Sequence, residues 1–130
     1  MKSKEQLILR IQLMGCQLNF KPYWDTESHS ILLEVRKPAQ IIDGQLTGSQ
    51  IDVYDDRTFR AWTPQTTKAN RYSRIHSLII RNLDGECELF VPAAKADEIL
   101  PHFGAIVKRS CSEATKAILK LFGEKKRSQE

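Results

Sequence analysis

The sequence predicts an α+β fold: a mostly antiparallel sheet of about five to six strands, with an N-terminal helix and two C-terminal helices. Short apolar runs separated by turn residues fill the middle of the chain, and helix-capping patterns stand near both ends. No internal repeat or low-complexity linker divides the chain, and its 130 residues are 41% hydrophobic, which is enough for one packed core. We therefore expect one domain over residues 1–123, followed by a frayed basic tail at 124–130.

A helix is expected at the start of the chain. Ser3 and Gln6 have the spacing of a capping box, and the apolar residues that follow recur at helical intervals. Residues 7–13 also alternate at period two, so a strand is the alternative. Gly15 favours the helix, because glycine suits the left-handed position that would end a helix at Met14.

The next apolar runs predict strands. Cys16–Tyr23 and Ile31–Val35 are expected to pair as a loose hairpin around the polar turn DTESHS. Pro38 ends the second strand because it has no amide hydrogen to donate to a ladder. Residues 39–50 hold two glycines among polar residues, so we expect a loop there with one short strand at Ile41–Ile42.

Two further strands, one containing Ile51 and one containing Phe59, flank an expected turn at Asp55–Asp56. The clearest local pattern follows, where SLIIRNL and ECELFV stand on either side of Asp84–Gly85. An Asp-Gly pair between two apolar runs predicts a two-residue hairpin, because its backbone twist matches that of the strands. The resulting register pairs Arg81 with Glu88, Ile80 with Leu89 and Ile79 with Phe90.

The last part of the chain predicts helices. Pro92 is expected to open a helix, which Pro101 ends or kinks before Gly104. A short strand is expected at residues 105–108, and a second capping box predicts a helix over residues 111–122.

The cysteines and the hydropathy pattern exclude several classes of protein. Cys16, Cys87 and Cys111 are odd in number and far apart, which argues against a disulfide framework or a zinc ribbon, so each is expected to be a buried apolar side chain. Charged residues interrupt the N-terminal apolar stretch, and no window approaches the ~18 apolar residues of a membrane span. We therefore expect a cytoplasmic protein with no membrane contact.

The distribution of charge is more informative than the net charge of +4. From Arg57 to Leu83 there is no acidic residue, and basic residues alternate with aromatic ones. Residues 63–73 within this segment are polar and are expected to be an exposed loop. Cations for phosphates and rings for bases are what single-strand nucleic-acid binding requires. The predicted contact residues are Arg57, Arg60, Lys68, Arg71, Tyr72, Arg74 and Arg81.

Two functional hypotheses follow from this pattern. The first is a small, non-enzymatic nucleic-acid-binding accessory protein that favours single strands. The second is an adaptor or inhibitor, such as an accessory factor of a mobile element, that docks on a larger protein, for example one that processes nucleic acid. Segregated charge steers protein partners as well as phosphates. The basic residues also fit a merely solvated face, and Phe59 and Trp62 fit a core. A homodimer is the default for a small soluble protein.

No pattern of catalytic or metal-binding residues stands out, and we expect neither an enzyme nor a cofactor. The three histidines have no metal-ligand spacing, and no glycine-rich phosphate loop is present. A metal-dependent nuclease is the outlying alternative: Asp52, Asp55 and Asp56 would hold Mg²⁺, with Arg57 or Lys68 steadying the phosphate. Asp55 and Asp56 also stand where a turn favours aspartate, so the turn is preferred.

Overall fold

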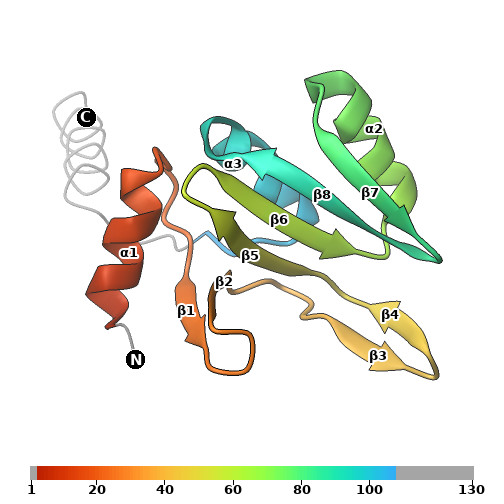
Figure 1. Cartoon of the computed structure of the whole chain (residues 1–130), viewed down its shortest axis with the longest axis horizontal. Helices are drawn as coiled ribbons and strands as arrows, with labels where there is room; N and C mark the ends of the chain where they lie inside the picture. The colour runs from red at the N-terminus through yellow and green to blue at the C-terminus, as the bar shows by residue number, and fades with distance from the viewer. Residues whose placement is uncertain (1–2, 108–130) are drawn as a thin grey trace, which may run out of the picture.

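The computed structural model describes residues 3–107 and places six strands in one antiparallel sheet, in the order β1-β2-β5-β6-β8-β7 (Figure 1). A further pair of strands forms a separate hairpin, which we call the arm (Gln40–Thr47). The predicted α+β class with an antiparallel sheet is confirmed. The strands are β1 (Pro22–Asp25), β2 (Ser30–Leu33), β3 (Gln40–Ile42), β4 (Gln45–Thr47), β5 (Gln50–Asp55), β6 (Thr58–Thr63), β7 (Ile79–Leu83) and β8 (Glu86–Pro92).

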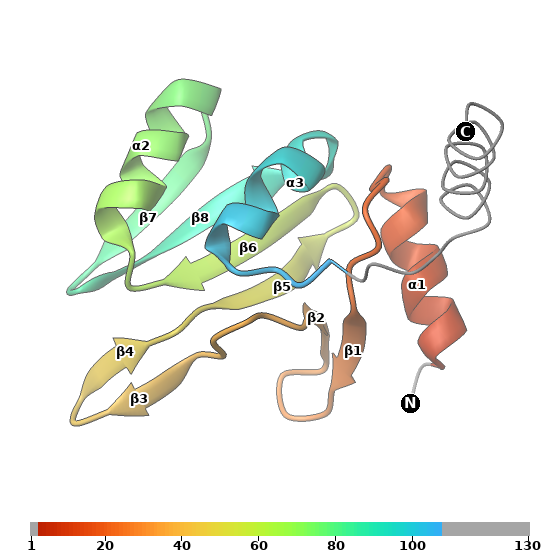
Figure 2. The same cartoon turned by 180° about the vertical axis from the view of Figure 1, so that it is seen from behind.

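Helices cover one face of this sheet. Helix α2 (Thr66–His76) contacts β7 and β8, whereas α3 (Ala93–Ile99) and the 3₁₀ turn η1 (Leu100–Phe103) contact β6 and β8 or each other (Figure 2). Helix α1 (Lys4–Leu13) packs beside β1. No helix of residues 3–107 is long and apolar enough to cross a membrane.

The core lies between the sheet and these helices. Side chains alternate along a strand, so every second residue of β6 and β8 faces the helices. Phe59 and Leu89 are fully buried on that face, and they belong to one cluster with Ala96 and Phe103. The opposite side of β5, β6, β8 and β7, which we call the open face, is covered by none of the described helices (Figure 1).

The predicted N-terminal helix is confirmed, and the strand alternative is wrong. Ser3 and Gln6 form both hydrogen bonds of the capping box. Leu7 and Ile11, one turn apart, are the buried residues of α1. Gly15 has a φ of +95°, as expected for the residue that follows the end of a helix.

Residues 63–73, predicted to be a loop, instead carry most of α2. The sequence lacks a signal for this helix at either end. Gln65 precedes it without a side-chain cap, and Ser77 rather than glycine takes the left-handed conformation after it, with a φ of 55°. Burial of Ala69 against the sheet decides the conformation, since most helical stability in a protein comes from packing.

The sequence predicted one of the two Asp-Gly hairpins and missed the other. At Asp84–Gly85 the predicted turn and all three predicted residue pairs between β7 and β8 are confirmed. At Asp43–Gly44 only a short strand within a loop was expected, whereas a complete hairpin forms. Asp43 and Gly44 have φ values of 52° and 77°, which are those of the tight turn that Asp-Gly favours.

The strand predicted from Cys16 begins only at Pro22. The reason is a side chain from α3: the carboxylate of Asp97 accepts hydrogen bonds from the amides of Gln17 and Leu18, at 2.8 and 3.0 Å, which would otherwise serve a strand. The β1–β2 hairpin itself and the β5–β6 pair are confirmed.

The C-terminal predictions are only partly covered by the structure. The helix after Pro92 is confirmed and passes into η1, which ends at Gly104 with a φ of 98°. Residues 105–107 form isolated bridges to Val35 and Phe20 in place of the expected strand. The predicted helix at 111–122, Cys111 and the tail lie outside the described residues.

Candidate nucleic-acid interface

The structure distributes the seven predicted contact residues over separate parts of the molecule. Two of them lie on the open face, and one lies in the turn between β5 and β6. The other four lie on α2, which is on the opposite side of the sheet. The residues on the open face are Arg60 and Arg81, the turn residue is Arg57, and the residues of α2 are Lys68, Arg71, Tyr72 and Arg74.

The cations of the open face are paired with carboxylates. Arg60 donates from Nε and Nη2 to the two carboxylate oxygens of Asp52, at 3.1 and 2.8 Å. Its Nη1 lies 3.3 Å from Glu88, and the same carboxylate lies 3.5 Å from Arg81. Burial raises the pKa of Asp52 above its ordinary value, and the opposing effect of the hydrogen bond from Arg60 offsets this rise only in part. These contacts leave the open face without surplus positive charge.

Aromatic residues surround this ion-pair network. The ring of Tyr54 meets the ring of Phe90 edge-on with centroids 5.0 Å apart, and the Arg60 guanidinium lies 5.6 Å from the Tyr54 centroid. Trp62 donates from Nε1 to Glu86 at 3.0 Å and is only half-buried, whereas Phe59, on the other face of the same strand, is a core residue. The core interpretation is therefore right for Phe59 and wrong for Trp62.

The cations of α2 have a different environment. Lys68, Arg71 and Arg74 recur at every third residue, so they lie on one side of the helix. None of the three forms an ion pair with a carboxylate of residues 3–107, and Arg71 and Arg74 are exposed. Tyr72 packs on the inner side of α2, where its ring stacks on His76 and contacts Phe103 edge-on.

A cleft adjoins the start of α2, between this helix and the arm. Its volume is about 420 Å³, and none of the twelve lining residues within 3–107 is acidic. Four of them carry basic side chains: Arg36 and Lys37 from the segment before the arm, Lys68 from α2 and His102 from η1. We call this the basic cleft.

Two cations of the basic cleft are attached to neighbouring peptide groups. Arg36 donates from Nη2 to the carbonyl of Pro101 at 3.1 Å, and Lys68 donates from Nζ to the carbonyl of His102 at 2.5 Å. Because these carbonyls belong to consecutive residues of η1, cations from two distant segments are held close together. The acid-free segment of the sequence could not indicate Arg36 and Lys37, which lie outside it and reach the cleft only through the fold.

The two walls of the basic cleft are joined by hydrogen bonds. The amide of Ser49 donates to the carbonyl of Lys37 at 2.9 Å, and its hydroxyl donates to Oγ1 of Thr63 at 2.9 Å. The same Oγ1 accepts from the amide of Gln65 at 3.2 Å, directly before α2. Ser49 and Thr63 are buried, so the segment holding Lys37 and the start of α2 have a fixed relative position.

The three aspartates of the nuclease alternative have separate partners. Asp52 binds Arg60, Asp55 accepts from the amide of Arg57 within the turn at 2.8 Å, and Asp56 forms an ion pair with Arg10. Within residues 3–107 no group of three potential metal-ligating side chains occurs.

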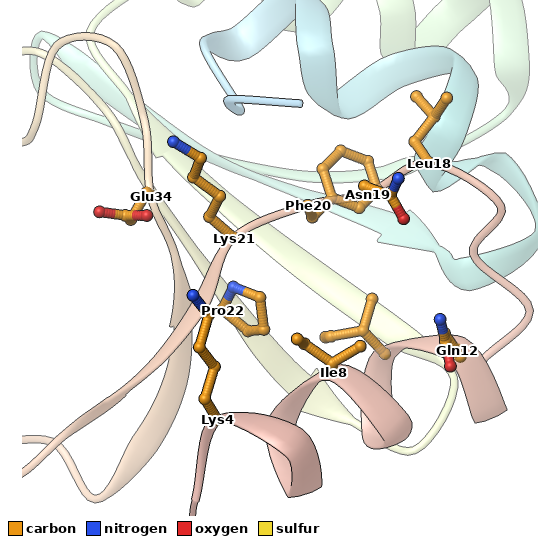
Figure 3. A pocket seen from close by; sticks show the side chains of 10 residues that line it. Lys4, Ile8, Gln12, Leu18, Asn19, Phe20, Lys21, Pro22 and Glu34 are labelled. Carbon is orange, nitrogen blue, oxygen red and sulfur yellow. The ribbon is translucent and has the colours of Figure 1, made fainter. Parts of the chain in front are cut away.

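A second hollow lies beside α1 and has a volume of about 300 Å³ (Figure 3). Its floor is apolar, with Ile8 and Phe20 prominent, and its rim carries Lys4, Lys21 and Glu34. Because its charges are mixed, this hollow favours an anion less than the basic cleft does.

No protein-family model, no curated protein and no solved structure matches this chain.

Proposed function

We propose that this protein binds nucleic acid, preferring single strands, as a non-enzymatic accessory protein that uses α2 and the basic cleft. The observation that carries the proposal is that Lys68, Arg71 and Arg74 of α2 have no described carboxylate partner and adjoin a cleft whose described lining residues include no acidic one. The proposed contacts are Lys68, Arg71 and Arg74, as the sequence suggested, together with Arg36 and Lys37. Arg57, Arg60, Tyr72 and Arg81 are left out.

The charge arrangement supports a polyanion. Arginine pairs with phosphate in two-point fashion, and an arginine already paired with a carboxylate has fewer donors to offer. Arg71 and Arg74 are exposed and unpaired with any described carboxylate, whereas Arg60 is bound to two carboxylates. The side of α2 that carries them therefore attracts phosphate, and the open face does not.

The size of the basic cleft supports a preference for single strands. A duplex cannot enter a space of about 420 Å³ between a helix and a hairpin. The backbone of a single strand bends more readily and can place a phosphate inside it.

The test is a titration of labelled single-stranded and duplex oligonucleotides of one sequence at two salt concentrations, followed by fluorescence anisotropy. We expect the single strand to bind more tightly, with an affinity that falls as salt rises. Arg71→Ala and Arg74→Ala should each reduce the slope of log K against log salt by about 0.7, because each removes one phosphate contact.

Arg81→Ala is the matched control, since it removes the same charge from the exposed part of the open face. It should leave both affinity and slope unchanged. The proposal is rejected if no oligonucleotide binds at low salt, or if Arg81→Ala weakens binding as much as Arg71→Ala.

Docking on a larger protein is the second candidate function, and the open face favours it. Ile79 and Tyr54 are 74% and 54% exposed on either side of Phe90. Exposed apolar side chains that cluster on one face mark protein contacts more often than nucleic-acid contacts. A protein that binds no oligonucleotide in the titration above would favour this candidate.

A further inference from the structure

We propose that the basic cleft binds a terminal phosphate monoester, so that the protein recognises a phosphorylated strand end; this inference rests on the proposed function. It assigns separate tasks to two groups of cations. Arg71 and Arg74 contact the backbone of the strand, and Arg36, Lys37 and Lys68 hold the phosphate at its end.

The convergence of charge favours a compact, doubly charged group. Arg36 and Lys68 come from separate segments of the chain, both line the basic cleft, and both are anchored to consecutive carbonyls of η1. Each keeps further donors, because a guanidinium has five N–H groups and an ammonium has three. A terminal monoester carries about −1.5 to −2 charges at neutral pH and three acceptor oxygens. An internal phosphodiester carries one charge, so converging cations discriminate in favour of the end.

The environment of α2 beyond the cleft is different. Arg71 and Arg74 are exposed on the outer side of the helix and do not line the cleft. A row of cations along a helix suits phosphates spaced along a chain, whereas cations gathered around one cleft suit a single phosphate group. The two groups should therefore be separable by mutation.

The basic cleft is also held rigid without a ligand. A Cβ on Gly48 would lie 2.2 Å from the carbonyl oxygen of Pro38 and 2.5 Å from that of Lys37, so the two backbone segments at the base of the arm are in direct contact. Together with the hydrogen bonds from Ser49 and Gln65 to Thr63, this contact fixes the backbone of Lys37 relative to the start of α2 before anything binds. Preorganised donors bind an anion without a further ordering cost.

The test compares three single-stranded oligonucleotides of one sequence: unphosphorylated, 5′-phosphorylated and 3′-phosphorylated. We expect one phosphorylated form to bind the wild-type protein about tenfold more tightly than the unphosphorylated form, a difference of about 1.4 kcal/mol, because only the terminal monoester offers the additional charge to the cations of the basic cleft. The double variant Arg36→Ala, Lys68→Ala should lose this ratio. The double variant Arg71→Ala, Arg74→Ala should weaken all three oligonucleotides and keep the ratio.

Lys37→Glu provides a second variant in case the first double variant fails to fold, because the Lys37 side chain is exposed and its loss removes no core contact. It should also remove the ratio while leaving the melting temperature unchanged. If the wild-type protein binds all three oligonucleotides equally, this inference is overturned and the proposed function stands. If it binds none of them, both fail.

Discussion

Arg60 and Asp52 face each other across β5 and β6 and form a two-point ion pair, with N–O distances of 3.1 and 2.8 Å. Asp52 is 5% exposed, and Glu88 on β8 contacts the same guanidinium. An arginine that the sequence suggested as a nucleic-acid contact thus links three neighbouring strands. Its positive charge is paired with carboxylates of the same chain.

The first prediction concerns the strength of this pair. Arg60→Ala should lower the free energy of unfolding by about 2 kcal/mol, because it leaves a buried carboxylate without its cation. Asp52→Ala should cost less, since Arg60 is partly exposed and keeps Glu88. In urea unfolding, the double variant should be more stable than the sum of the single effects by about 1 kcal/mol. Additive effects would show that the two side chains do not interact appreciably.

The second prediction concerns pH. Burial raises the pKa of Asp52 above its ordinary value, so the folded protein holds this proton more tightly than the unfolded chain. The associated stabilisation is present below the unfolded pKa, near 4, and is lost as the pH rises through the higher folded pKa. The free energy of unfolding of wild type minus that of Asp52→Asn should therefore decrease between about pH 3 and about pH 6. An increase over that range would mean that Arg60 outweighs burial.

The third prediction compares two glycines with nearly equal backbone conformations. Gly48 and Gly44 have φ values of +76° and +77°, but only Gly48 is crowded by neighbouring carbonyls. Gly44→Ala should lower the free energy of unfolding by about 1 kcal/mol through backbone strain alone. Gly48→Ala should cost about 3 kcal/mol, since the backbone segments at the base of the arm must also move apart. Equal melting temperatures of the two variants would contradict the close contact at Gly48.

The fourth prediction concerns thiol reactivity. Burial, followed by the negative charge of Asp97, raises the pKa of Cys16 to about 11, and burial also raises the pKa of Cys87. Because the thiolate is the nucleophile, both thiols should resist iodoacetamide at about pH 8 in the folded protein and react in urea. Cys111→Ser removes the remaining thiol, so that mass spectrometry reports on these two. Rapid labelling of Cys16 in the folded protein would show that the α1 end of the core opens.

Parts of the fold with a short-range signal could be predicted from the sequence. The capping box of Ser3 depends on residues within one helical turn, and the hairpin at Asp84–Gly85 depends on two strands that are adjacent in the sequence. Helix α2 could not be predicted, because nothing at Gln65 caps it and its stability comes from packing on the sheet. The irregular course after Cys16 depends on Asp97, a residue far along the chain.

The candidate site, like the fold, could be predicted from the sequence only in part. The segment without acidic residues between Arg57 and Leu83 contains Lys68, Arg71 and Arg74 of α2, which form no ion pair with a carboxylate of residues 3–107. The same segment contains Arg60 and Arg81, which the sequence also suggested as contacts. Their pairing could not be foreseen, because the carboxylate that both contact lies on a neighbouring strand outside the segment.

By itself, the sequence determined the class of the fold, the N-terminal helix and the registered hairpin, because hydrophobic periodicity, caps and turns are properties of residues close together along the chain. Only the tertiary structure decided which cations remain available. Electrostatic attraction depends on distance in space. The fold brings Arg36 and Lys68 to consecutive carbonyls of η1, whereas it brings Arg60 to the carboxylate of Asp52.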